Sequence, residues 1–127
     1  MSGLLINMYL KQHMVVEKRI DHVGGVWHVK TPTKHVECTD GFRMSVQVGE
    51  NNYCSPKDYF APWYDTAEVW NCNLPVPEFE PYGDGDAPYG YVPVELIDTI
   101  ILQHGDIREQ VNSEVATVAL PDINEGT

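Results

Sequence analysis

Residues 42–71 read FRMSVQVGENNYCSPKDYFAPWYDTAEVWN, and this stretch decides the fold. Apolar and polar side chains alternate from Phe42 to Val48, which is the period-two pattern of a half-buried strand. Thr66–Trp70 is predicted to form a second strand. The connection between them, Gly49 to Asp65, is long for a hairpin, and a long loop on a rigid hairpin is a common place for function.

Toward the N-terminus, Asp40-Gly41 is a tight-turn dipeptide. It predicts a hairpin between a short strand, Val36–Thr39, and Phe42–Val48. The hairpin would place Phe42–Val48 centrally in a small antiparallel sheet. Val26–Lys30 also alternates, so it is predicted to be a further strand.

Toward the C-terminus, Val92–His104 is predicted to be an α-helix, because Pro93 suits its first position and Gly105 suits its C-terminal cap. Its wide apolar face would pack across the sheet. Residues 71–90 hold four prolines and three glycines, so neither a strand nor a helix is expected there. The predicted fold class is therefore α+β: a small antiparallel β-sheet packed by one C-terminal α-helix, with long loops rich in proline, glycine and aromatic residues.

Three regions are predicted along the chain: an N-terminal extension over residues 1–14, an α+β domain over residues 15–105, and a C-terminal tail or edge strand over residues 106–127. No apolar run approaches the roughly 20 residues of a membrane span, so no membrane contact is expected. The three cysteines are odd in number and form no CxxC pair. They fit the reduced thiols of a cytosol better than a disulfide framework.

The net charge of −11 is unevenly distributed. Residues 58–127 carry fourteen Asp or Glu against one Lys or Arg, a net charge of −13, whereas residues 1–57 have a net charge of +2. Because binding of a nucleic-acid backbone needs cations, direct binding by the second half is not expected. An acidic surface that docks on a basic partner protein is favoured instead, and the alternative is that the charge serves solubility.

Candidate metal ligands do not form a recognisable site. The candidates are His28, His35, Cys38, Cys54 and Cys72. One pair has the spacing His-x-x-Cys, but no second tight pair follows it, as a zinc site would require. Asp84 and Asp86 lack the rest of a calcium loop. We therefore expect no metal and no cofactor.

Catalytic signatures are also weak. Cys54 lies beside Ser55 and Lys57, and a nearby cation lowers a thiol pKa, but no histidine is placed by the sequence to act as a base. Glu78 and Glu80 are paired carboxylates in a segment too rich in glycine and proline to hold two groups rigidly. The chain is therefore predicted not to be an enzyme.

Two candidate binding sites remain. The first is the aromatic loop with one preceding cation: Arg43, Tyr53, Cys54, Ser55, Lys57, Tyr59, Trp63 and Tyr64. Its rings could stack on a base while its cations hold phosphates, which would suit a cyclic nucleotide, or they could anchor a protein interface. The competing interpretation is that half of the rings complete the core. The second site is the acidic segment EFEPYGDGDAPYGY, with Glu78, Glu80, Asp84 and Asp86.

Short motifs in this chain resemble a family of small uncharacterised proteins encoded by tailed bacteriophages. They are Met44-Ser45-Val46-Gln47, Tyr53-Cys54-Ser55-Pro56-Lys57, Glu68-Val69, Tyr91-Val92-Pro93-Val94-Glu95 and His104-Gly105. The resemblance covers about residues 42–105. The chain departs from the family's pattern over residues 60–64, where a small residue and Gly-Pro-Tyr are expected. The resemblance implies a phage accessory protein in the host cytoplasm, and it implies no reaction.

These features predict a phage-encoded, non-enzymatic inhibitor of a bacterial defence system, similar in role to an anti-CRISPR protein. Its acidic loops would bind a basic, nucleic-acid-binding groove on a host defence protein. Two alternatives stay open: a sponge that sequesters a nucleotide immune signal through the aromatic loop, and a phage structural or assembly protein. A homodimer also stays open.

Overall fold

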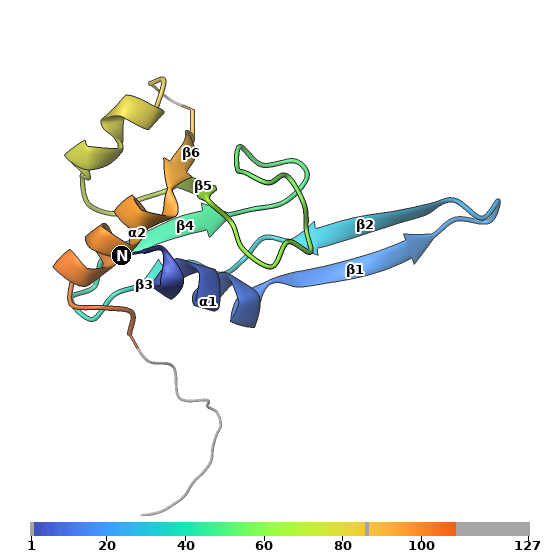
Figure 1. Cartoon of the computed structure of the whole chain (residues 1–127), viewed down its shortest axis with the longest axis horizontal. Coiled ribbons are helices and arrows are strands. Elements are labelled where there is room, and N and C mark those ends of the chain that lie inside the picture. Colours follow the sequence, from blue (N-terminus) through green and yellow to red (C-terminus); the bar gives the residue numbers. More distant parts are fainter. Residues whose placement is uncertain (1, 86, 109–127) are drawn as a thin grey trace, which may run out of the picture.

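The computed structural model describes residues 2–85 and 87–108. In chain order its elements are α1 (Leu4–His13), β1 (Val15–Ile20), β2 (Val26–Thr31), β3 (Val36–Glu37), β4 (Arg43–Gln47), β5 (Thr66–Trp70), the 3-10 helix η1 (Pro77–Tyr82), β6 (Tyr89–Pro93) and α2 (Val94–Gln103). Figure 1 shows a body that contains β3 to β6 and both α-helices, from which β1 and β2 project as a long arm. In the described residues, no helix is both long enough and apolar enough to cross a membrane.

A four-stranded antiparallel sheet with the order β3-β4-β5-β6 forms the centre of the body. Met44 pairs with Val36 on one side of β4, and Val46 pairs with Val69 of β5 on the other. Met44 and Val46 are both buried, as the alternation in the sequence predicts. The predicted hairpin, the strand at Thr66–Trp70 and the central position of the stretch after Gly41 are therefore confirmed.

Helix α2 covers this sheet and confirms the α+β class. Val94, Ile97, Ile100 and Ile101 are buried in one core with the strands. The helix begins two residues later than predicted, because Tyr89–Pro93 is extended and pairs with β5. Gly105 ends the helix as predicted: it has a φ of +90°, and Asp106 N–H donates to the Ile101 carbonyl oxygen at 3.0 Å.

The predicted N-terminal extension is instead part of the core. Helix α1 packs against α2, with Ile6 and Leu10 at most 1% exposed. Its N-cap residue, Gly3, has no side chain, and from its own segment the Ser2 hydroxyl accepts a hydrogen bond from the Leu4 N–H group at 3.2 Å. The carboxylate of Asp98, on α2, accepts hydrogen bonds from the backbone N–H groups of Leu5 and Ile6, both at 3.0 Å. A domain boundary after residue 14 would separate α1 from the helix that caps it.

The expectation that residues 71–90 contain neither helix nor strand is wrong. They contain η1 and the start of β6. Pro77 lies in the first turn of η1, where a missing N–H group costs no hydrogen bond. Phe79, at 0% exposure, inserts into the core, and its ring centroid lies 5.6 Å from that of Tyr89. A buried ring thus ties this proline-rich segment to the sheet.

Candidate functional site

The aromatic loop, Gly49–Asp65, is anchored by two of its predicted binding residues. Tyr59 and Tyr64 are 8% and 4% exposed. Tyr64 N–H donates to Asn7 Oδ1 at 2.8 Å, and Asn7 Nδ2 donates to the Tyr64 carbonyl oxygen at 3.0 Å. A Cβ on Gly49 would lie 2.5 Å from the Tyr59 ring, so the close approach of this ring requires glycine there. The Tyr64 ring thus belongs to the core cluster and its backbone ties the loop to α1, while the Tyr59 ring packs against Gly49.

The thiol and hydroxyl beside these rings are also enclosed. Cys54 is 1% exposed, and burial raises its thiol pKa in spite of the nearby Lys57. The Ser55 hydroxyl shares a hydrogen bond of 2.8 Å with the Thr66 hydroxyl on β5. The thiol that the sequence marks as a candidate nucleophile is therefore a protonated, buried group at neutral pH.

The cysteines should react slowly with a thiol reagent such as dithionitrobenzoate at pH 8. Burial raises the thiol pKa of Cys38 and of Cys72 to about 11, and the thiol pKa of Cys54 is also raised. Because the thiolate is the reactive form, we expect less than one thiol per chain to react promptly in the folded protein and all three to react in 6 M guanidinium. Prompt labelling of Cys54 in the folded protein would show an accessible nucleophile and contradict its burial.

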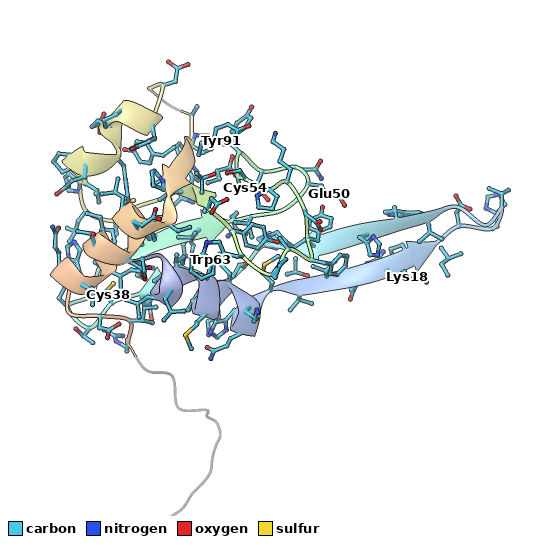
Figure 2. All side chains as sticks on the ribbon, viewed as in Figure 1. Lys18, Cys38, Glu50, Cys54, Trp63 and Tyr91 are labelled. Atoms are coloured by element: carbon cyan, nitrogen blue, oxygen red, sulfur yellow. The ribbon has the colours of Figure 1, made fainter. Side chains whose placement is uncertain are left out.

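On the exposed side of the loop, one cation lies against two rings. Lys57 Nζ lies 5.3 Å from the ring centroid of Tyr53 and 5.8 Å from that of Tyr91, within the range of cation–π attraction. Tyr53 and Tyr91 are about half exposed. Tyr91 was not predicted here, because it comes from β6 and its position depends on a φ of +55°. Figure 2 shows Tyr91 near the loop that carries Cys54.

The predicted nucleotide-binding set is not brought together. Arg43 begins β4, at the end of the strand opposite to the loop, and its backbone pairs with Asn73. Trp63 is 38% exposed, but it is not among the side chains that contact Lys57. Arg43 and the loop that carries Lys57 thus lie at opposite ends of β4.

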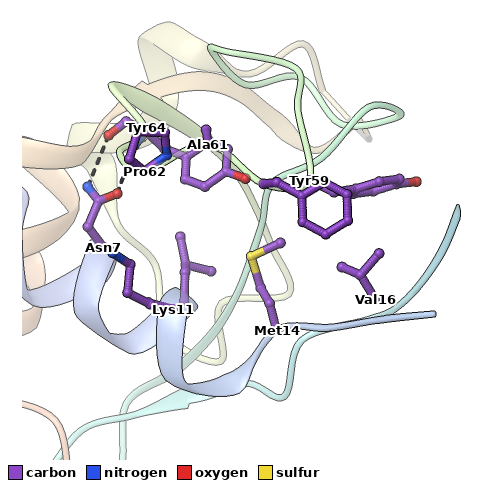
Figure 3. A pocket seen from close by; sticks show the side chains of 10 residues that line it. Asn7, Lys11, Met14, Val16, Tyr59, Ala61, Pro62 and Tyr64 are labelled. Carbon is purple, nitrogen blue, oxygen red and sulfur yellow. Dashed lines mark hydrogen bonds between the residues drawn. The ribbon is translucent and has the colours of Figure 1, made fainter. Parts of the chain in front are cut away.

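A groove of about 370 Å³ lies between the aromatic loop, the C-terminal half of α1 and the base of the arm. It is lined by Asn7, Leu10, Lys11, Met14, Val16, Tyr59, Phe60, Ala61, Pro62 and Tyr64. Figure 3 shows the paired hydrogen bonds of Asn7 and Tyr64 at one end of this groove and Val16 at the other. The groove was not predicted from the sequence, because the residues that line it come from three separate segments of the chain.

The acidic segment keeps its predicted exposure. Glu78 and Glu80 lie on η1 and Asp84 follows it, all three exposed, whereas Asp86 lies outside the described residues. Glu80 Oε2 accepts a hydrogen bond of 3.4 Å from the Tyr89 hydroxyl. No ion pair joins these three carboxylates to any cation within the part of the chain that the structure describes.

The metal-ligand candidates occupy separate places. The His28 ring packs edge-on against Phe60, with centroids 5.1 Å apart, and the Cys38 thiol faces the Ile101 carbonyl oxygen. Among residues 2–85 and 87–108, no three His, Cys, Asp or Glu side chains gather closely enough to hold a metal ion.

Comparison with known proteins assigns no function to these sites. No protein-family model, curated protein or solved structure matches this chain. The resemblance to phage proteins remains a prediction.

Proposed function

We propose that this protein is a non-enzymatic binding protein whose acidic segment occupies a basic surface on a partner protein. The observation that carries the proposal is the placement of η1. Its carboxylates Glu78 and Glu80 are exposed, while Phe79 between them is completely buried. A segment held in this way loses little conformational entropy when it binds, so its charges act as a preorganised surface.

The charge of this surface is not neutralised by the chain itself. No Lys, Arg or His occurs from residue 58 to residue 103. The acidic segment therefore lies in the middle of a long stretch without cations, on a protein of net charge −11. The negative electrostatic potential around such a segment speeds association with a positively charged surface and opposes contact with nucleic acid.

The resemblance to phage proteins extends the proposal to a partner class. A host defence protein that handles nucleic acid needs a basic groove for the phosphate backbone. Carboxylates displayed from η1 would compete for that groove. The protein would then act in the host cytoplasm as a stoichiometric inhibitor, and the buried Cys54 is consistent with a role that needs no nucleophile.

Neutralising the acidic segment should weaken binding to such a partner at least about tenfold. The variant is Glu78→Gln/Glu80→Gln/Asp84→Asn, and the partner is obtained by capture on the tagged protein from a lysate of infected cells. Wild-type affinity should fall roughly tenfold between 50 and 500 mM salt, because exposed charges are screened. Isothermal titration at the two salt concentrations measures both effects.

A matched control variant distinguishes an effect of the acidic segment from an effect of net charge alone. Glu50, Asp65 and Glu95 are exposed and lie outside the acidic segment. The variant Glu50→Gln/Asp65→Asn/Glu95→Gln removes the same number of charges, and we expect it to change the affinity less than about threefold. Equal losses in the two triple variants would mean that net charge, and not η1, governs binding.

A further inference from the structure

The arm formed by β1 and β2 is a two-stranded sheet whose strands do not pair with any strand of the body. Its antiparallel register runs through six residue pairs, from Val15↔Thr31 to Ile20↔Val26. At its tip, Asp21 Oδ1 accepts hydrogen bonds from the N–H groups of Val23 and Gly25. A two-stranded sheet is only marginally stable in water unless something covers one of its faces.

The body covers only the base of one face of the arm, because Lys18, Ile20 and Val26, farther along this face, are exposed. Val16, His28 and Lys30 are partly buried on this face. The His28 ring contacts Phe60 of the aromatic loop, and Lys30 Nζ donates to Gln47 Oε1 of β4 at 2.7 Å. The body thus supports the base of the ribbon on this side.

The opposite face, here called the open face, is entirely exposed. Because side chains of directly paired residues point to the same side, three cross-strand pairs form it: Val15–Thr31, Glu17–Val29 and Arg19–Trp27. Val15, Trp27 and Val29 are 52%, 46% and 38% exposed. Apolar side chains therefore alternate with charged ones on a surface that nothing in the described chain covers.

The charges on the open face indicate which molecule packs against it. The face carries one anion, Glu17, and one cation, Arg19, which form an exposed ion pair at 2.6 Å within the chain, so it is neutral on a protein of net charge −11. A uniformly acidic partner would oppose Glu17, and a uniformly basic partner would oppose Arg19. A second copy of the chain supplies both charges, and it meets the first copy where the mutual repulsion is smallest.

We propose that the open face packs against the open face of a second copy, with the two arms antiparallel. With a two-fold axis at the level of the Lys18–His28 pair, β1 lies over the partner's β1. Glu17 then faces the partner's Arg19, and Trp27 faces the partner's Val29. The symmetry repeats both contacts in the opposite sense, so the Glu17–Arg19 ion pairs of the two copies combine into one network of four charges.

The size of the face sets the strength of the contact. A ribbon of six residue pairs is roughly 20 Å long and roughly 10 Å wide, which buries on the order of 200–300 Å² per copy. Standard interfaces bury about 800 Å² per partner. We therefore expect a weak dimer that is populated only at high protein concentration.

Sedimentation velocity of the full chain from 10 µM to 1 mM tests the proposal. We expect the wild-type sedimentation coefficient to rise with concentration and Trp27→Glu to raise the dimer dissociation constant at least about tenfold. The control is Val26→Glu, which adds the same charge one residue away on the other face, at an exposed position; it should change the constant less than about threefold. A wild-type protein that stays monomeric at 1 mM, or equal effects of the two variants, would overturn the proposal.

A mixing experiment distinguishes a second copy from any other occupant. Glu17→Arg alone and Arg19→Glu alone should each weaken self-association, because like charges then face each other. Mixing the two variants should restore association above that of either alone. No recovery on mixing would overturn the two-fold arrangement, and an Arg19-dependent interaction with an oligonucleotide probe would then point to nucleic acid as the occupant. The triple variant of the acidic segment should leave self-association unchanged, which separates this inference from the proposed function.

Discussion

Replacing Asp98 by alanine should lower the free energy of unfolding by about 2–4 kcal/mol. Its carboxylate is buried and accepts hydrogen bonds from the N–H groups of Leu5 and Ile6, each at 3.0 Å. The substitution removes two charge-assisted hydrogen bonds and leaves buried donors unpaired. The helix dipole of α1 adds to the loss, since the carboxylate lies at its positive end. Urea denaturation at pH 7 measures the change.

Two further variants show which part of the interaction matters. Glu95→Ala removes an exposed carboxylate from the same helix, and we expect it to cost less than about 1 kcal/mol. Asp98→Asn keeps an acceptor oxygen and should lose less stability than Asp98→Ala. If Asp98→Ala were as stable as Glu95→Ala, α1 would not depend on α2 for its cap, and the N-terminal segment would be separable from the domain after all.

The cap that Asp98 supplies to α1 also shows which structural features local sequence patterns cannot predict. Strands β4 and β5 and helix α2 follow from local alternation, local periodicity and Gly105, all of which lie within a few residues of the element they define. The cap of α1 comes from a residue more than ninety positions away. Local rules for helix starts can find Ser2, whose hydroxyl accepts the Leu4 N–H hydrogen bond, but they cannot find the acceptor of the next two N–H groups, because it lies in another helix.

The candidate site, too, was predicted only in part from local sequence patterns. Exposure of Tyr53, Lys57 and the acidic side chains agrees with the sequence, but the burial of Tyr64 depends on Asn7, a residue of the segment expected to be an extension. Composition marks aromatic residues without saying which of them enter the core. The open face of the arm was missed for a related reason: an alternating pattern predicts a half-buried strand, and Val29 alternates without being covered by the chain.

Phe79→Ala should produce the largest loss of stability, about 3–5 kcal/mol. The ring is 0% exposed, and truncating a buried phenylalanine removes both its transfer free energy and its packing contacts. A loss of this size is a large part of the 5–15 kcal/mol that holds a typical domain together. It would establish that the proline-rich segment belongs to the cooperative core, which its composition did not predict. Thermal and urea denaturation measure the loss.

The same variant links the stability of η1 to its proposed role. Phe79 N–H donates to the Val76 carbonyl oxygen at 3.0 Å and Gly83 N–H to that of Glu80 at 3.1 Å, so hydrogen exchange of these amides reports on the segment. In Phe79→Ala both amides should exchange faster, and affinity for a basic partner should fall although every carboxylate is kept. Glu78→Ala, the adjacent exposed substitution, should leave exchange unchanged. A Phe79→Ala protein that lost less than about 1 kcal/mol and bound normally would mean that the carboxylates act from a mobile segment, and preorganisation would no longer explain their recognition.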